Sequence, residues 1–170
     1  VEVWTFREFL ARVDPSRALA PELSLPEAVE ELRRHAEPIL AARPWRHRNE
    51  LRAEELFAEL HAHLIGAAMP VAFAGRRACA APALSEANYR SLREETIGTK
   101  AVDGALLVLR RLPPEAARRL FAAPVAAFER ARGLQDGTTA LDARFSFDWV
   151  LVDEVQDLTL AEQWLLVDVA

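Results

Sequence analysis

The strongest constraint on the fold of this chain is a short apolar run, residues 149–152, that ends abruptly at two adjacent acids, Asp153 and Glu154. Aromatic, β-branched and leucine side chains without a polar interruption are typical of a strand buried on both faces, as in a parallel sheet covered by helices. The carboxyl ends of such strands are where open α/β sheets bind their ligands. The run therefore predicts a strand of an α/β core that carries two carboxylates at its ligand-binding end.

A helix is expected directly after these acids. Thr159 is followed three residues later by Glu162, which is the spacing of a capping box, in which two side chains satisfy backbone N–H groups at a helix start. The helix should begin at Leu160 and present Leu160, Trp164 and Val167 to the sheet.

The residues around the two acids resemble motif II, the Walker B element, of the UvrD/Rep-like superfamily 1 DNA helicases. That motif reads Asp-Glu-x-Gln-Asp after an apolar strand, and residues 152–157 read Val-Asp-Glu-Val-Gln-Asp. The resemblance implies that Asp153 holds the magnesium ion of MgATP, usually through water, and that Glu154 orients and deprotonates the attacking water. It also implies that Gln156 belongs with the catalytic residues and Asp157 with those that bind the cofactor.

Each of these residues also fits a plainer interpretation. The two acids would then be solvated residues at a strand end, and Gln156 and Asp157 would form a turn before the helix. The four residues in this order favour motif II. Glu162 departs from the family, since many relatives carry glutamine there, and neither it nor the adjacent Gln163 is assigned a role.

The beginning of the chain resembles a second motif of the same family. Residues 1–3 alternate apolar and acidic side chains as a strand does, and Thr5 with Glu8 forms a capping box that predicts a helix over residues 6–13. This order resembles motif Ib, a strand followed by Thr-Phe that touches single-stranded DNA, and implies that Thr5 and Phe6 contact DNA. A role as helix cap alone also explains the threonine.

Between the two ends, the hydrophobic period is helical. Ser24 with Glu27 marks the start of a helix that Pro44 ends, and a second helix is expected over residues 51–65. The apolar positions that should face the core from the first helix are Ala28 or Val29, Leu32, Ala36, and Ile39 or Leu40; those from the second are Leu51, Leu56, Leu60 and Leu64.

Three more helices are expected further along the chain. Ser85 should cap a short helix through Leu92, and residues 98–104 should separate it from a helix over residues 105–111. A longer helix should begin at the prolines 113 and 114 and end before Gly133, with an interruption near Pro124.

The densest basic and aromatic cluster is residues 43–48, Arg-Pro-Trp-Arg-His-Arg. Arginine pairs with phosphate and tryptophan stacks on bases, so Trp45, Arg46 and Arg48 are candidate DNA contacts. The alternative is a solvated connector with Trp45 packed into the core. The net charge of −5 is not that of a typical nucleic-acid-binding protein, so any DNA contact must come from a local patch.

Lys100 is the only lysine of the chain, which bears directly on ATP binding. A phosphate-binding P-loop requires Gly-x-x-x-x-Gly-Lys-Ser/Thr, and the positions around this lysine hold Glu94, Thr99 and Ala101 instead. If the resemblance holds, the chain is part of a motor whose P-loop lies elsewhere, and the chain alone should not hydrolyse ATP.

Composition narrows the remaining possibilities. The single Cys79 excludes an internal disulfide and a cysteine-rich zinc site. No apolar run approaches the about 20 residues of a membrane span, and no signal peptide is recognisable. We therefore expect a cytoplasmic protein without a membrane partner.

These features predict a mainly α-helical chain with a small parallel β component, as a fragment of a RecA-like P-loop motor domain that carries a helical insertion. Residues 1–13 would form the motif Ib-like strand and helix, residues 14–146 the inserted helical subdomain, and residues 147–170 the Walker B strand and the following helix. The resemblance implies a parent ATP-dependent DNA helicase or translocase that uses Mg²⁺ and ATP. Its partners would be single-stranded DNA or a duplex junction, and the remainder of the helicase chain.

Two other functions remain open from the sequence. One is a stand-alone helical interaction module with an inactive motif II remnant. The other is a carboxylate metal hydrolase built on Asp153, Glu154 and Asp157, although no histidine lies near them in the sequence.

Overall fold

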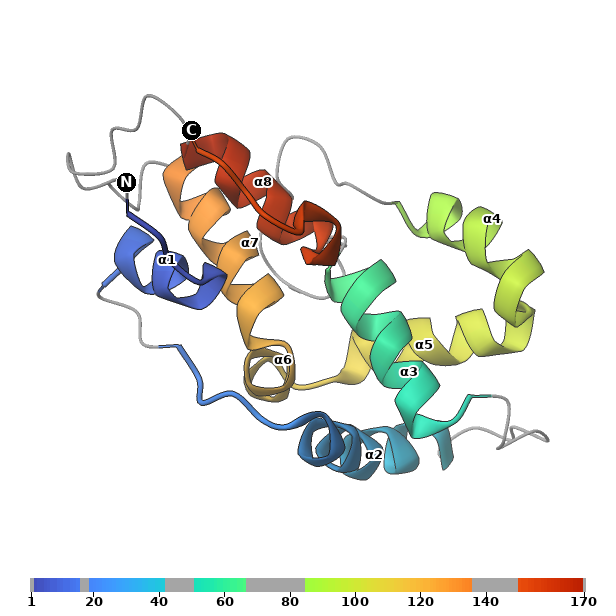
Figure 1. Cartoon of the computed structure of the whole chain (residues 1–170). Coiled ribbons are helices and arrows are strands. Elements are labelled where there is room, and N and C mark those ends of the chain that lie inside the picture. Colours follow the sequence, from blue (N-terminus) through green and yellow to red (C-terminus); the bar gives the residue numbers. More distant parts are fainter. Residues whose placement is uncertain (1, 16–18, 42–50, 67–84, 136–149, 170) are drawn as a thin grey trace.

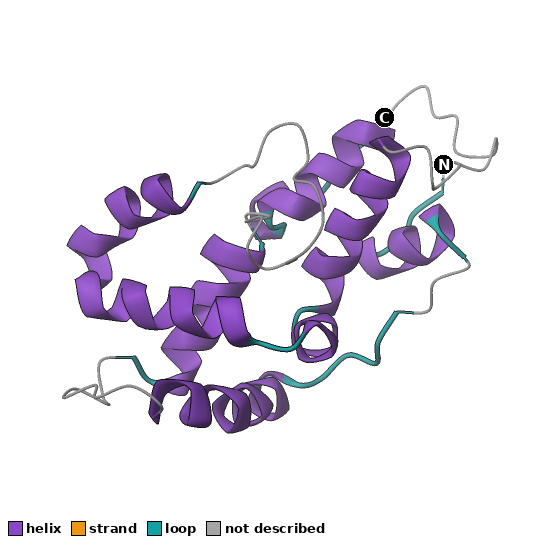
Figure 2. Ribbon diagram, turned by 180° about the vertical axis from the view of Figure 1, so that it is seen from behind, coloured by secondary structure: helices purple, strands orange, loops and turns teal. Residues whose placement is uncertain are grey.

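The computed structural model of the chain describes residues 2–15, 19–41, 51–66, 85–135 and 150–169 (Figure 1). This described part is mainly helical, and Figure 2 shows the same helices from behind. Its eight α-helices are α1 (Phe6–Val13), α2 (Leu25–Ala41), α3 (Ala53–Glu59), α4 (Glu86–Ile97), α5 (Thr99–Arg111), α6 (Pro114–Leu120), α7 (Ala122–Gln135) and α8 (Leu160–Val169). A π-helical turn, η1 (Leu60–Ile65), continues α3, and a 3₁₀ turn, η4 (Val155–Asp157), precedes α8. None of the described helices is long and apolar enough to cross a membrane.

The capping boxes begin their helices where the sequence predicts. At α1, Glu8 N–H donates to Thr5 Oγ1 at 3.2 Å and Thr5 N–H donates to the Glu8 carboxylate at 2.7 Å. At α2, Ser24 N–H donates to the Glu27 carboxylate at 2.9 Å. These bonds satisfy backbone donors that a helix start leaves without an intrahelical acceptor. The predicted helix over residues 6–13 is confirmed.

The larger of the hydrophobic cores lies among α2, α3, η1, α5 and α6. Of the positions that the helical period selects, Ala28, Leu32, Ala36, Leu56, Leu60 and Leu64 are buried in it, and Ile39, Leu40 and Leu51 are partly buried against it. The same core takes in Val102 and Leu106 of α5 and Phe121, which lies between α6 and α7. The amphipathic faces predicted for the first two helices of this core are therefore confirmed.

A second core joins the two ends of the chain through α7. Phe9, Leu10 and Val13 of α1 and Leu165 of α8 are buried together with Ala127 of α7. Figure 1 shows α1 and α8 against α7, with both termini at the same end of the molecule. The first and last helices are thus held near each other by a helix from the middle of the sequence.

A buried polar network fastens α3 to α4. Glu59 is 4% exposed; its carboxylate accepts two hydrogen bonds from the Arg93 guanidinium, at 2.9 and 3.0 Å, and one from the Tyr89 hydroxyl at 2.8 Å. Burial, and then the hydrogen bond to Glu59, raise the pKa of the Tyr89 hydroxyl. Each polar group of this network finds a partner, which is what makes its burial tolerable.

The later helices differ from the prediction at their boundaries. α4 continues to Ile97 and α5 begins at Thr99, so Gly98 alone, at φ 85°, makes the break that was expected over residues 98–104. A residue with positive φ ends a helix in one step, and glycine adopts such a φ without steric cost. α7 also runs two residues past Gly133, to Gln135.

The interruption predicted from Pro124 is confirmed. Helices α6 and α7 are separated at Phe121, whose φ of −127° and ψ of 50° leave the helical region. Proline has no N–H to donate to the carbonyl four residues earlier, which here belongs to Leu120. The break therefore lies one turn before the proline.

The predicted strands do not form in the described part of the chain. Residues 2–5 and 150–152 have no strand; Leu151, which was expected to be buried, is 94% exposed, and Val3 is 88% exposed. A strand is stabilised by hydrogen bonds to a neighbouring strand, and no strand lies beside these residues among the described ranges. The prediction of a buried parallel β component is therefore wrong for these residues; Val1 and Trp149 lie outside the described ranges.

Candidate functional site

The four predicted motif II residues come together in one exposed loop, residues 153–158, which we call the acidic loop. It holds the one-turn helix η4, in which Asp157 N–H donates to the carbonyl of Glu154 at 2.8 Å and Leu158 N–H to that of Val155 at 3.2 Å. The side chains of Asp153, Glu154, Gln156 and Asp157 are all exposed. The loop presents three carboxylates and one amide to solvent just before α8.

Glu154 has an unusual backbone conformation within this loop. Its φ of 51° and ψ of 42° are left-handed, and it is the one non-glycine residue with positive φ in the described ranges. Its N–H donates to Asp153 Oδ1 at 3.0 Å, and Gln156 Nε2 donates to its carboxylate. Such a conformation costs of order 1–3 kcal/mol and is concentrated at functional sites, where the surrounding structure enforces it.

This strain predicts that Glu154→Asn stabilises the chain. Asparagine adopts the left-handed region more readily than glutamate, so the free energy of unfolding should rise by about 1 kcal/mol. Urea unfolding followed by circular dichroism measures the change. Glu154→Gln is the matched control, because it removes the same charge without the preference for positive φ. Equal stabilities of the two variants would contradict the prediction.

Gln163 of α8 forms hydrogen bonds with the backbone of the acidic loop. Its Nε2 donates to the carbonyl of Leu158 at 2.9 Å and to that of Val155 at 3.3 Å. Both acceptors are backbone groups of the turn that follows the strained glutamate. The sequence analysis assigned this residue no role; the available signal was a glutamine in the first turn of a capped helix, within reach of the preceding loop.

The start of α8 follows the predicted capping box. Thr159 N–H and Oγ1 both donate to the Glu162 carboxylate at 2.7 Å, and the two residues are 8% and 6% exposed. The predicted helix face is wrong at Leu160, however. Leu160 is 38% exposed, whereas Ala161 and Leu165 are buried. The physical reason is that α8 packs on α7 rather than on a sheet; Trp164 packs with Phe128 of α7, and the side chain of Val167 lies outside the description.

The end of η1 contacts the same helix start. The N–H of Ala161 donates to the carbonyl of Gly66 at 2.8 Å. Gly66 belongs to the part of the chain formed by α2 to α6 with η1, which we call the helical part, so a backbone group of the helical part binds the first turn of α8. His61 of η1 lies close to Glu162 and stacks on Phe57, with ring centroids 6.1 Å apart. Burial lowers the pKa of the His61 imidazole, and the negative charge of Glu162 opposes this in part.

The lowered pKa of His61 predicts a loss of stability on acidification. Because the unfolded chain takes up the proton first, stability from neutral His61 is complete above its ordinary pKa of 6.5 and falls as the pH drops toward the lower folded value. His61→Phe keeps an aromatic ring but cannot titrate. The difference in unfolding free energy between this variant and the wild type should therefore grow in favour of the variant below about pH 6.5. A pH-independent difference, measured by urea unfolding, would contradict this.

Of the residues predicted to contact DNA, the structure describes only Thr5 and Phe6. Thr5 caps α1, and its hydroxyl donates to the Glu8 carboxylate at 3.0 Å. Phe6 is half-buried against the second core, with its ring centroid 5.8 Å from that of Phe9. Trp45, Arg46 and Arg48 lie outside the described residues.

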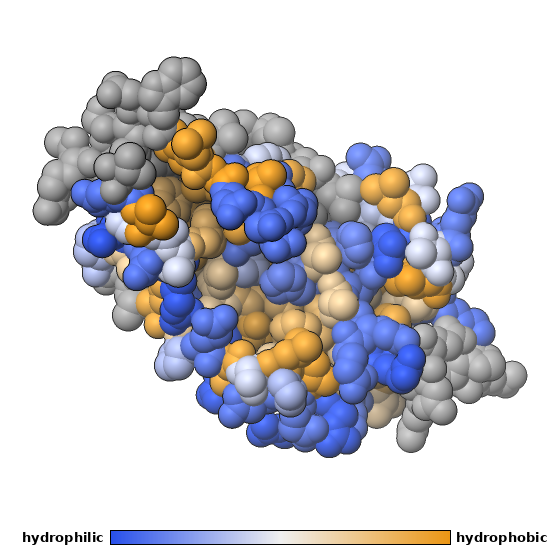
Figure 3. All heavy atoms as spheres, in the orientation of Figure 1, coloured by the Kyte–Doolittle hydropathy of each residue, from blue (hydrophilic) through white to orange (hydrophobic). Residues whose placement is uncertain are grey.

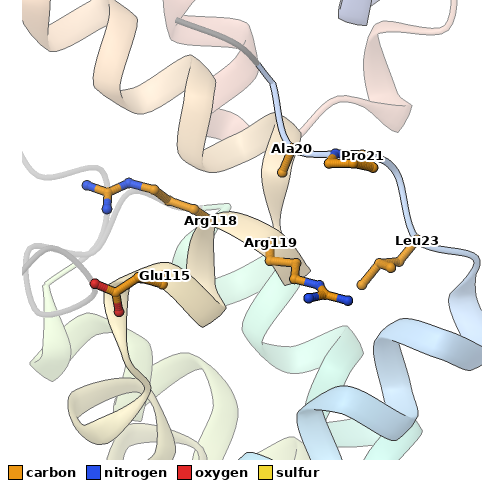
Figure 4. A pocket seen from close by; sticks show the side chains of 6 residues that line it. All are labelled: Ala20, Pro21, Leu23, Glu115, Arg118 and Arg119. Carbon is orange, nitrogen blue, oxygen red and sulfur yellow. The ribbon is translucent and has the colours of Figure 1, made fainter.

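A cavity of about 440 Å³ lies between residues 19–23 and α6, apart from the acidic loop (Figure 4). Its walls include Pro21, Leu23 and two arginines, whose side chains point in different directions. Arg118 pairs with Glu129 at 3.0 Å and Arg119 with Glu31 at 3.1 Å. The cavity includes none of the predicted site residues.

The carboxylates of the acidic loop do not form a metal centre by themselves. Among the described residues, no three histidine, cysteine, aspartate or glutamate side chains lie close enough together to hold a metal ion. The ligand set that a metal hydrolase on Asp153, Glu154 and Asp157 requires is therefore not formed. A magnesium ion that also binds phosphate oxygens and water needs only one or two carboxylates, which the exposed Asp153 fits.

Comparison with known proteins adds no relative from which a function could be transferred. No protein-family model matches the chain, and searches of curated proteins and of solved structures find no similar protein.

Proposed function

We propose that this chain is part of an ATP-dependent DNA helicase or translocase of the UvrD/Rep-like superfamily 1, in which the acidic loop supplies the motif II residues. The observation that carries the proposal is the order Asp153, Glu154, Gln156, Asp157 in one exposed loop directly before a capped helix. The strained backbone of Glu154 supports it, since such conformations are concentrated at functional sites.

The proposed chemistry divides among the loop residues. Asp153 would hold Mg²⁺, which neutralises charge on the phosphates of ATP when bound. Glu154 would accept a proton from the attacking water, and the amide of Gln156, which donates to the Glu154 carboxylate, would fix its direction. Asp157 would contribute to nucleotide binding through the neighbouring motifs.

The exposed apolar residues before the loop support the proposal that the chain belongs to a RecA-like domain. Val150, Leu151 and Val152 are exposed at 36%, 94% and 39%. Figure 3 shows apolar side chains at the surface on the face that carries this segment. Consecutive exposed apolar residues mark a surface that another element covers. Strands from the rest of the parent protein would cover these, and would complete the sheet that the described residues lack.

Flanking sequence and ATPase activity test the proposal. A longer protein that contains this chain should carry a P-loop before Val1 and a Gly-Asp-x-x-Gln stretch after Ala170. It should hydrolyse ATP in the presence of Mg²⁺ and faster with single-stranded DNA, whereas the isolated chain should show no turnover. A natural protein without any P-loop, or magnesium-dependent ATPase in the isolated chain, would overturn the proposal.

A helical interaction module is the second candidate function, and the same exposed Leu151 favours it, because a protein partner would cover that side chain equally well. The discriminating result is the behaviour of Asp153→Ala in the longer protein. Under the helicase proposal this variant loses magnesium-dependent ATPase, whereas under the module hypothesis there is no ATPase to lose.

A further inference from the structure

The π-helical turn η1 ends in a tight contact that only glycine permits. Gly66 N–H donates to the carbonyl of His61, five residues back, at 2.9 Å, which closes the wide turn. A methyl group built on Gly66 would lie 2.9 Å from both Cβ and Cγ2 of Thr159 and would collide with the His61 carbonyl oxygen. The backbone of η1 therefore lies directly against the residue that caps α8.

The first turn of α8 receives this contact through a specific hydrogen bond. The first N–H groups of a helix have no intrahelical acceptor. Here the Ala161 N–H finds its acceptor in the Gly66 carbonyl at 2.8 Å, while Thr159 and Glu162 cap the same turn. In addition to the packing of α8 on α7, this carbonyl therefore joins η1 directly to the first turn of α8.

The same turn of α8 also contacts the acidic loop, through the side chain of Gln163. Gln163 lies two residues after Ala161 and donates to the carbonyls of Leu158 and Val155. Those carbonyls belong to the turn that begins at Glu154. Two sets of hydrogen bonds, joined by the α8 backbone between Ala161 and Gln163, therefore connect η1 to the loop that bears the candidate catalytic carboxylate.

We propose that Gly66 is a positioning residue: η1 and Gly66 form a joint that sets the placement of the acidic loop through the start of α8. A π turn has a discrete alternative, because an α-helical turn would pair the Gly66 N–H with the carbonyl of Ala62 instead and redirect the carbonyl that Ala161 uses. The joint couples the helical part to Glu154. Its significance rests on the proposed function, since it would allow DNA bound to the helical part to influence the water-activating carboxylate.

Gly66→Ala in the isolated chain tests the joint directly by two-dimensional NMR. The backbone resonances of residues 154–157 should shift although none of them is substituted and the atoms nearest to the new methyl group belong to His61 and Thr159. Gly98→Ala is the matched control: it adds the same methyl group at a strained position, φ 85°, where no atom lies within 4 Å, at the break between α4 and α5. It should leave residues 154–157 unchanged. Equal effects of the two variants, or none from either, would overturn the joint.

A measurement on the unsubstituted chain covers the case in which Gly66→Ala fails to fold. The second amide of a helix ordinarily exchanges rapidly with solvent, because it has no intrahelical acceptor. The Ala161 amide should instead exchange as slowly as the amides in the middle of α8. Exchange as fast as in an unstructured peptide would show that Gly66 does not hold this turn.

The longer protein separates this inference from the proposed function. Gly66→Ala should lower kcat for DNA-stimulated ATP hydrolysis more than it raises KM for ATP, because it displaces Glu154 without touching the nucleotide contacts. Shifted loop resonances with unchanged ATPase would leave the joint standing and count against the catalytic role of the loop. Unshifted resonances would overturn the joint whatever the ATPase.

Discussion

Glu59→Gln should lower the free energy of unfolding of the isolated chain by about 3 kcal/mol. The substitution keeps the shape of the side chain but leaves the Arg93 guanidinium facing an amide that cannot neutralise it. This is the lower end of the range for a broken buried pair, because 21% of the Arg93 side chain remains in contact with solvent. The loss is large relative to the 5–15 kcal/mol that typically stabilises a domain, and urea unfolding followed by circular dichroism measures it.

Two further variants separate charge from shape in this network. Tyr89→Phe removes only the hydroxyl that donates to Glu59, so it should cost about 1 kcal/mol, the net worth of one hydrogen bond. Glu54→Gln changes an exposed glutamate of the same helix and should stay within about 0.5 kcal/mol of the wild type. If Glu59→Gln were no more destabilising than Glu54→Gln, the network would not hold α3 to α4.

Glu154→Gln in the longer protein should reduce DNA-stimulated ATP turnover by about 10²-fold or more. Glutamine has nearly the same shape but accepts no proton at neutral pH, so the attacking water loses its base. Binding of ATP and of single-stranded DNA should remain, since the substitution removes neither a phosphate contact nor the magnesium ligand proposed at Asp153. Steady-state ATPase and nucleotide-binding titrations together measure the two effects.

The control for this variant is Glu95→Gln, which removes one exposed carboxylate from α4. It should leave turnover near that of the wild type. Near-normal turnover in Glu154→Gln would refute the assignment of the general base, even in a protein that carries a P-loop.

The helix starts were predictable because their causes are local. A threonine or serine with glutamate three residues later closes its hydrogen bonds within one turn, whatever the rest of the chain does, and α1, α2 and α8 begin accordingly. The length of the break at Gly98 was harder to predict. A glycine is compatible both with a one-residue break at positive φ, as observed, and with the start of a longer irregular segment, as expected. The strands could not be predicted from local residues alone, since a strand forms only with a neighbouring strand that lies elsewhere in the sequence.

The candidate site shows the same division. The order of the acids identifies the loop, because carboxylate chemistry depends on residue type. Three other features depend on how α8 packs against the helical part. They are the positive φ of Glu154, the hydrogen bonds from Gln163 to the loop backbone, and the bond between the Ala161 N–H and the Gly66 carbonyl. No periodicity in the sequence encodes that geometry, and the resemblance to motif II does not extend to it.

The packing of α7 has a consequence for how this protein can be dissected. Residues 14–146 resemble an insertion in sequence, yet α7, within that span, provides the surface on which α1 and α8 meet. Cutting the span out and joining the flanks would remove α7, the helix against which both terminal helices pack. In such a shortened protein, α1 and α8 would lose the helix on which they pack. The middle of the chain must therefore be kept whenever its ends are studied.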